Sequence, residues 1–217
     1  IPTAYDFRSV DVARGGQGAP LVPPFHEWLF NKTDGEVIVV NIGGISNISI
    51  LRQNSMETYG FDCGPGNCLL DVWCQKNDRG SFDKNGAWAS SGKLIEPLLR
   101  SMLGDRYFEL PTPKSTGSDY FNEEFIRYYL QRANQLGAAP EDVQSTLTML
   151  TVESIALSIE KLGVKSGSTA YFCGGGCKNT TLLENLKRRL APITVLTTDT
   201  IGIDPDFVEA AAFAWFA

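Results

Sequence analysis

The chain has 217 residues, 43% hydrophobic and 20% charged, with a net charge of −6, which is an ordinary composition for a globular protein. The acidic balance argues against a protein that binds a nucleic-acid backbone, and the densest basic run, Leu186–Leu190, has the pattern of the polar face of a helix. No apolar run is long enough to span a bilayer, and there is no secretory signal pattern.

Cysteine and histidine usage excludes two common kinds of site. The cysteines form no CxxC pair and His26 is the only histidine, so the spacing of a zinc site is absent. We expect free thiols in a reducing cytoplasm. We also expect His26 to be a packed helix residue, which leaves no histidine for a Ser-His-Asp triad.

The first segment has the pattern of a strand end followed by a loop. AYDFRSVD (Ala4–Asp11) is expected to end a strand, and the glycine-rich Ala13–Pro23 breaks any regular element. A short helix is expected over Phe25–Phe30. Because the chain begins at Ile1 without a methionine and stops inside a helix-like run, we expect it to be a piece of a longer protein.

The next segment predicts a β-hairpin. Glu36–Leu51 has β-branched runs on both sides of Gly43-Gly44. A plain turn needs only the glycines, whereas a phosphate-binding hairpin would turn its N–H groups and the Ser46 hydroxyl toward an anion. The pattern alone favours the plain turn.

A carboxylate stands in a stiff, glycine-rich segment after the hairpin. A strand over Glu57–Phe61 leads into GFDCGPGN, and a helix is expected over Cys68–Asn77. The usual role of an aspartate before a helix is a cap, but Asp62 lies too far ahead of this helix to cap it. A carboxylate near glycines in a cleft can take a proton from water or a sugar hydroxyl, so we predict that Asp62 is a catalytic base.

The middle of the chain is predicted to be helical around an irregular insert. Gly80–Lys114 reads as irregular, with one helix over Lys93–Leu103, and another helix begins near Asn122. The longest periodic stretch, Pro140–Gly163, has proline at its first helical position and glycine at its stop. The loop Pro111–Gly117 either holds an anion or faces water.

The last third alternates strand and helix, which predicts a βαβ unit with parallel strands. A strand runs into CGGGCKN (Cys173–Asn179), then come a helix, the strand Ile193–Asp199 and a final helix. Three consecutive glycines favour close approach of the backbone to a nucleotide over a plain turn. The spacing is not GxGxxG, which disfavours a Rossmann site. Glu209 stands in an otherwise apolar helix and either lies on its exposed face or points into a site.

Taken in order, these motifs closely resemble those of the anhydro-N-acetylmuramic acid kinase family over the whole chain. The resemblance implies an α/β fold, a ribonuclease-H-like lobe of the sugar kinase, actin and Hsp70 superfamily, with a mixed sheet that opens with a β-hairpin and is flanked by helices. It implies that residues 1–23 end a first lobe and its connecting loop. Residues 24–217 then form the second lobe, with an insert near 80–121. The motifs that carry the resemblance are DFRSVDVARGGQGAPLVPPFH, NIGGISNIS, GFDCGPGNCLLDVW, FDKNGAWASSG, PKSTGSDYFN, DVQSTLTMLT, CGGGCKN and TTDTIGIDPDFVEAAAFAW.

The resemblance also implies a reaction. An ATP-dependent kinase of this family opens the ring of 1,6-anhydro-N-acetylmuramic acid with water and phosphorylates O6, giving N-acetylmuramic acid 6-phosphate in peptidoglycan recycling. Asp62 matches the family's base for the water. The other implied site residues are Arg8, Gln17 and Glu209 around the sugar, and Gly43, Gly44, Ser46, Asn47, Gly174, Gly175, Gly176 and Asn179 around the nucleotide.

The chain departs from the family pattern because it has no GTSxDG-like phosphate loop. ATP and Mg²⁺ are implied, but we assign no metal ligand here. We expect this chain alone to be inactive, to need an N-terminal lobe, and to expose an apolar face that invites a partner or a homodimer. A cytoplasmic location is implied, with neither nucleic acid nor membrane as a partner. The alternatives are another sugar kinase of the superfamily and a non-catalytic fragment that binds sugar or a partner chain.

Overall fold

One mixed sheet organises the part of the chain that the computed structural model describes, residues 3–15, 21–31, 35–52, 59–164 and 167–217. There the sheet has five strands in the order β3-β2-β1-β4-β5. The hairpin prediction is confirmed because β1 and β2 are antiparallel. Strands β4 and β5 run parallel as the last third predicted, and β1 pairs parallel with β4 as well. The strands are β1 Val37–Ile42, β2 Ile45–Leu51, β3 Tyr59–Pro65, β4 Thr169–Cys173 and β5 Thr194–Thr197.

Helices surround this sheet. Two helix starts are confirmed, since Asn122 caps α7 through its side chain and Pro140 is the first residue of α8. The α-helices are α1 Phe7–Ala13, α2 Pro23–Leu29, α3 Cys68–Lys76, α4 Ala87–Ser91, α5 Glu96–Leu103, α6 Arg106–Glu109, α7 Glu123–Arg132, α8 Pro140–Lys161, α9 Thr180–Leu190 and α10 Val208–Phe216; short 3₁₀ turns are η1 Lys84–Gly86, η2 Gly175–Lys178, η3 Thr198–Ile201 and η4 Pro205–Phe207.

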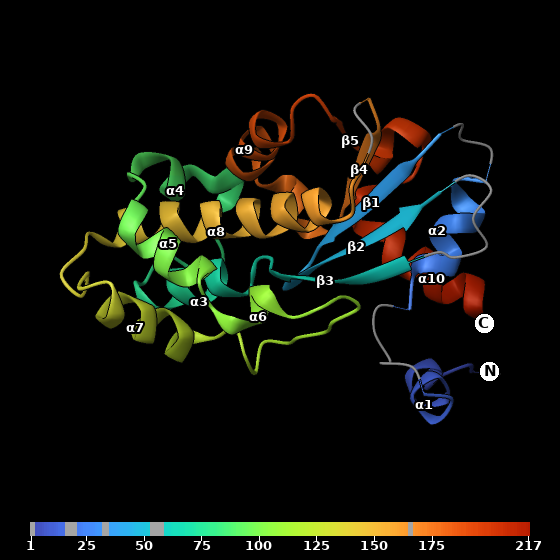
Figure 1. Ribbon diagram of the computed structural model, residues 1–217, viewed down its shortest axis with the longest axis horizontal. Helices are drawn as coiled ribbons and strands as arrows, with labels where there is room; N and C mark the ends of the chain where they lie inside the picture. Colours follow the sequence, from blue (N-terminus) through green and yellow to red (C-terminus); the bar gives the residue numbers. More distant parts are fainter. Residues whose placement is uncertain (1–2, 16–20, 32–34, 53–58, 165–166) are drawn as a thin grey trace.

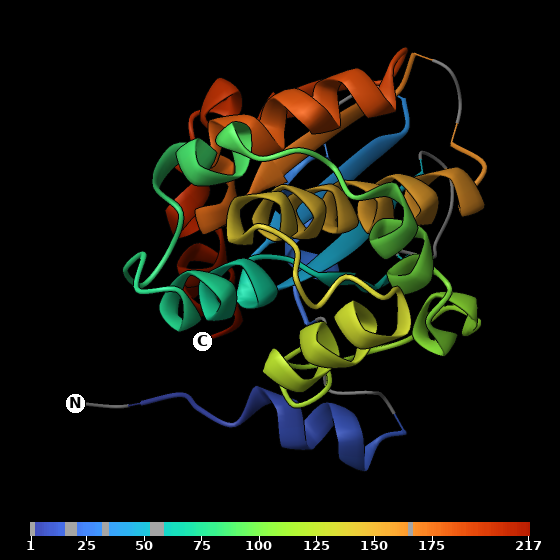
Figure 2. The same cartoon turned by 90° about the vertical axis from the view of Figure 1, so that its left-hand side faces the viewer.

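The two faces of the sheet pack against different helices, as the alternation of side chains along a strand requires. In β1, Ile38 and Val40 pack with residues of α8 and α9 in one core. Val37 and Val39 point to the other face and pack with residues of α2 and α10. Figures 1 and 2 show this arrangement, with the long helix α8 lying over one face of the sheet.

Helix α8 also joins the sheet to a second hydrophobic core. Its N-terminal half packs with α3, α5, α6 and α7, which Figure 1 shows gathered beyond one end of the sheet. Its C-terminal half packs on the sheet. The helix is therefore buried around most of its circumference, and Met149 contacts both cores.

Three sequence expectations were wrong in detail. Ala4–Asp11 does not end a strand, because Asp6 accepts a hydrogen bond from the Ser9 N–H and starts helix α1. The insert is more helical than expected, because the Asp83 carboxylate accepts the N–H groups of Trp88 and Ala89 and so starts α4. Strand β3 continues past Phe61 to Pro65. Among the described residues, none of the helices combines the length and apolarity that crossing a bilayer requires.

Candidate active site

The register of the sheet lines up four side chains in one row. Asp62 of β3 pairs with Asn47 of β2, Asn47 pairs with Asn41 of β1, and Asn41 pairs with Cys173 of β4. Directly paired residues project from the same face of a sheet, here the face that α2 and α10 cover. Strands β1 and β4 are parallel, and the row lies near their carboxyl ends, where ligands bind in open α/β sheets.

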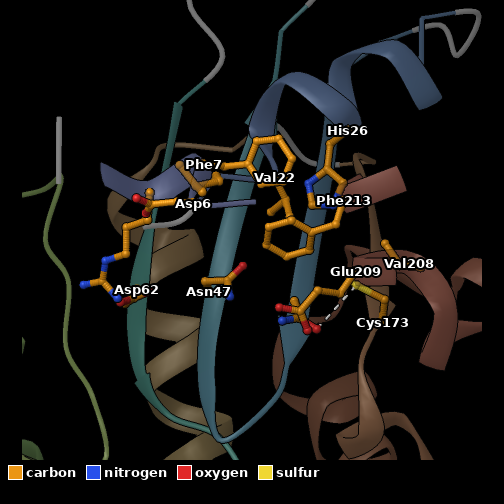
Figure 3. A pocket seen from close by; sticks show the side chains of 13 residues that line it. Asp6, Phe7, Val22, His26, Asn47, Asp62, Cys173, Val208, Glu209 and Phe213 are labelled. Carbon is orange, nitrogen blue, oxygen red and sulfur yellow. Dashed lines mark hydrogen bonds between the residues drawn. The ribbon is translucent and has the colours of Figure 1, made fainter. Parts of the chain in front are cut away.

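This row forms one wall of a pocket of about 430 Å³, a volume in the range of small-molecule sites. Figure 3 shows Asp62 and Glu209 on opposite sides of the pocket, with Asn47 between them. Arg8, from α1, is also a lining residue. The structure thus brings together three of the predicted residues, Asp62, Arg8 and Glu209, whereas Gln17 lies outside the described residues.

Asp62 is held on both its main chain and its side chain. It is 5% exposed. Its carboxylate Oδ2 accepts the Thr116 N–H at 3.0 Å. Its own N–H donates to the Lys114 carbonyl at 2.9 Å, and its carbonyl accepts the Tyr107 hydroxyl at 2.7 Å. The turn expected at Asp62 is therefore a strand. The main chain of Asp62 pairs with β2 on one side and is bonded to the loop that contains Lys114 and Thr116 on the other.

Burial and neighbouring groups act in opposite directions on the Asp62 carboxyl. Burial is the largest effect and raises its pKa above the ordinary aspartate value. The Thr116 N–H and the positive charge of Arg8 lower the pKa in part. A carboxylate whose proton affinity is raised by burial, yet which is fixed by a hydrogen bond, is suited to accept a proton.

A β-bulge follows Asp62. Asn47 pairs with Asp62, but the preceding Ser46 pairs with Gly64, so Cys63 is an extra residue in β3. Gly64 has a φ of +150°, and an added Cβ would lie 2.9 Å from the Phe108 ring. Bulges re-aim side chains and occur often next to active sites. The glycine at position 64, two residues after Asp62, therefore serves the bulge and its packing against α6.

His26 and two asparagines are lining residues of this pocket that sequence reasoning did not place there. His26 is packed in α2 as expected, 1% exposed, with its Nδ1 3.0 Å from the Ser49 hydroxyl. Burial lowers its pKa to about 4, so the ring is neutral at pH 7. Asn41 was not proposed at all, and Asn47 was expected at the nucleotide. The signal that places them is the pairing register with Asp62, which the sequence does not state.

A second pocket, of about 520 Å³, contains the glycine turn after β4. Gly175 and Asn179 line it together with Phe82 and Lys84 from the insert. Asp71 lines it as well, and burial raises the pKa of that carboxyl to about 6. The volume and the mixed apolar and polar lining suit a nucleoside.

The three consecutive glycines have different reasons to be glycine. A Cβ on Gly176 would lie 2.6 Å from the Ile42 Cβ, and Gly174 has a positive φ beside the Ile42 carbonyl. These two are required by close packing on β1. Only Gly175 is open, with no atom within 4 Å of an added Cβ, so it is the one that faces the pocket.

The hairpin residues that were predicted to lie at the nucleotide have different structural roles. The carbonyls of Gly43 and Gly44 accept N–H groups of residues 66, 67 and 68, which ties the hairpin to the start of α3. Ser46 is fully buried and donates to the Pro65 carbonyl at 3.3 Å, so its hydroxyl is not on a surface that an anion reaches. Asn179 accepts the Leu182 N–H and caps α9. Among the described residues, no three His, Cys, Asp or Glu side chains gather as a metal site.

Comparison with known proteins identifies the family of this chain. The family model for anhydro-N-acetylmuramic acid kinase matches residues 1–217. The chain belongs to the anhydro-N-acetylmuramic acid kinase family. It is 47% identical over 217 residues to the family member of Pasteurella multocida (strain Pm70), covering 100% of this chain and 57% of that protein. It is 46% identical over 219 residues to that of Legionella pneumophila (strain Corby), covering 100% and 58%.

The chain thus spans less than three fifths of the length of these anhydro-N-acetylmuramic acid kinases. Among solved structures, it is similar to the activator of the 2-hydroxyisocaproyl-CoA dehydratase from Clostridium difficile with bound ADPNP. The TM-score is 0.50 at 14% identity, covering 88% of this chain and 63% of the other, which concerns the fold alone. The fold is a lobe of the actin and Hsp70 type, so the predicted fold class is confirmed.

Proposed function

We propose that the full-length protein containing this chain is an ATP-dependent kinase that opens 1,6-anhydro-N-acetylmuramic acid with water and phosphorylates its O6. The observation that carries the proposal is Asp62, a buried and oriented carboxylate on the wall of a sugar-sized pocket in a chain of this family. Residues 24–217 form the second lobe in this proposal, with the insert near 80–121, and residues 1–23 lead from the first. The proposed location is the cytoplasm.

In the proposed reaction, Asp62 takes a proton from water as the water oxygen attacks C1 of the sugar. The bond from C1 to O6 breaks, O6 bonds to the γ-phosphorus of ATP, and ADP leaves with the electron pair of the broken phosphoanhydride bond. A positioned general base contributes about two to four powers of ten to such a rate. Arg8, near Asp62, and Glu209, across the pocket from it, would hold the sugar's polar groups.

The second pocket would take the nucleoside part of ATP, with Gly175 at its edge and Asn179 beside it. Gly43 and Gly44 would lie toward the phosphates. Magnesium, when bound, neutralises charge on the transferring phosphate. We assign it no ligand among the described residues. Phosphoryl transfer depends on groups positioned around the phosphates, so this chain alone should give no product without the rest of the protein.

Isotope labelling tests the reaction. The full-length protein, ATP, magnesium and the anhydrosugar are incubated in ¹⁸O-water, and the product is analysed by mass spectrometry. The expected product carries one phosphate and one ¹⁸O atom at C1. Authentic N-acetylmuramic acid 6-phosphate in the same water corrects for exchange at C1. Phosphorylation of ordinary hexoses but not of the anhydrosugar would instead identify another sugar kinase, and sugar binding without phosphorylation would identify a binding fragment.

Arg8 gives a pH prediction that is independent of the overall rate. Its charge lowers the pKa of Asp62, so Arg8→Gln should raise that pKa further. A base works only when ionised, and activity falls as pH drops through its pKa. The acid limb of kcat/KM against pH should therefore move to higher pH in Arg8→Gln. Arg8→Lys, which keeps the charge, should stay closer to the parent, and an acid limb that is identical in all three proteins would contradict the proposed coupling.

A further inference from the structure

The loop that follows α6 approaches Asp62 from the open edge of the sheet. Strand β3 is the edge strand, and the loop supplies the Lys114 carbonyl and the Thr116 N–H to it. The Tyr107 hydroxyl reaches the Asp62 carbonyl from α6. Together, these bonds fix the main chain of Asp62 and the direction of its carboxylate.

The side chain of Lys114 points into the protein, where neither sequence interpretation of this loop had placed it. It is 8% exposed. Its Nζ donates to the Tyr107 carbonyl at 2.8 Å and lies 4.1 Å from the centre of the Tyr107 ring. The lysine therefore anchors the loop on the residue whose hydroxyl holds Asp62.

Lys114 and Tyr107 act at a distance from the chemistry. Neither is among the described residues that line the pocket of Asp62 or the nucleoside pocket. Their contacts lead to Asp62 along two routes, through the loop main chain and through the tyrosine hydroxyl. A displacement of about 1 Å at a reacting group can cost on the order of a hundredfold in rate, so such anchors bear on catalysis.

We propose that Lys114 and Tyr107 form a clamp that positions the Asp62 carboxylate for the reaction, without contacting the substrate. The proposal rests on the proposed function, because it gives Asp62 the role of base. It adds two residues that determine the position and direction of the Asp62 carboxylate.

The effect of Lys114 on stability helps to distinguish a positioning role from a purely structural one. Burial, with a smaller effect of the neighbouring Lys161 charge, lowers the pKa of Lys114 to about 8. A base with a lowered pKa in the folded state binds fewer protons there than when unfolded. Its charged form therefore opposes folding at pH 7, and this cost disappears as pH rises from about 8 toward the unfolded value. Lys114→Met removes the buried charge and so should not lower stability by much.

The test uses Lys114→Met and Tyr107→Phe in the full-length protein. Each is expected to lower kcat by about tenfold with KM within about twofold, because the base is misaligned while substrate binding is kept. The double variant should lose less than the product of the two losses, since both act through Asp62. Tyr129→Phe is the matched control. It also removes a buried tyrosine hydroxyl that donates to an oxygen, here Asp105 Oδ2 at 2.6 Å, so it should lower Tm and leave kcat unchanged.

A second readout does not need turnover. In ¹³C-aspartate-labelled protein, with the Asp62 signal identified through Asp62→Asn, Lys114→Met should move the Asp62 titration to higher pH, because a displaced loop loses the Thr116 N–H that lowers that pKa. Unchanged kcat and unchanged titration in folded Lys114→Met and Tyr107→Phe would overturn the clamp. If the Asp62 titration moves to higher pH in Lys114→Met but the parent does not phosphorylate the anhydrosugar, the result counts against the proposed function alone.

Discussion

Asp62→Asn is expected to lower kcat of the full-length protein by about two to four powers of ten, while the sugar and ATP still bind. Asparagine keeps the shape of the side chain and an oxygen that can accept the Thr116 N–H, but it cannot take a proton from water. Binding of both ligands, measured by calorimetry, should be close to that of the parent. The loss should then lie in kcat and not in KM.

The same variant should be at least as stable as the parent at pH 7. The pKa of Asp62 is raised in the fold, so the folded state binds more protons than the unfolded state above the ordinary aspartate pKa. Ionised Asp62 thus costs stability at neutral pH, and the neutral amide removes that cost. Asp142→Asn is a matched control, because its carboxylate also accepts one N–H, that of Lys93, but it lies outside both pockets. Turnover of Asp62→Asn close to that of Asp142→Asn would mean that the water is activated elsewhere.

Gly174→Ala is expected to destabilise the fold by about 3 kcal/mol or more. Gly174 has φ +85° and ψ 169°. Residues other than glycine rarely adopt this backbone conformation, which costs them about 1–3 kcal/mol. An alanine Cβ there would also lie 2.7 Å from the Ile42 carbonyl oxygen, and overpacking costs about 1–3 kcal/mol more. For a chain of this length, the expected fall in Tm is about 6–12 °C.

Gly175→Ala is the neighbouring control for this prediction. The added methyl group meets no atom within 4 Å and Gly175 has no positive φ, so Tm should stay within about 2 °C of the parent. Both variants are measured by calorimetry on the chain. Equal Tm values for the two would show that the turn relaxes freely and that the packing of Gly174 against β1 is not a constraint.

Most elements of the fold follow from local patterns in the sequence. The hairpin at Gly43-Gly44 and the helix from Pro140 carry their own turn and start signals, which work over a few residues. Helix α1 was missed because its start depends on one capping bond from Asp6, in a segment whose apolar residues suggested a strand. Helix α4 of the insert was missed for a similar reason, since its start depends on the Asp83 carboxylate, which accepts N–H groups five and six residues further along the chain.

From the sequence, a candidate site residue could be recognised only where its residue type and its immediate neighbours were unusual together. Asp62 stood out because an acid among glycines has few structural reasons to be there. Asn41 did not, because an asparagine in a strand becomes a pocket residue only through its pairing register with distant strands. His26 did not, because a single histidine in a helix pattern is expected to be a packed residue. Neither interpretation of the loop Pro111–Gly117 included a buried Lys114, because a lysine in a polar loop is usually exposed. The sequence does not show that the loop folds back so that Lys114 packs on the ring of Tyr107.

Helix α8 makes the sheet core and the helical core one cooperative unit. A helix buried on most sides cannot open while either core stays packed, since its two halves belong to different cores. Its central amides should therefore exchange with deuterium only when the whole domain unfolds. Loss of packing near the nucleoside pocket would be transmitted to the strand that carries Asp62, so damage in one core should appear as loss of protection in both.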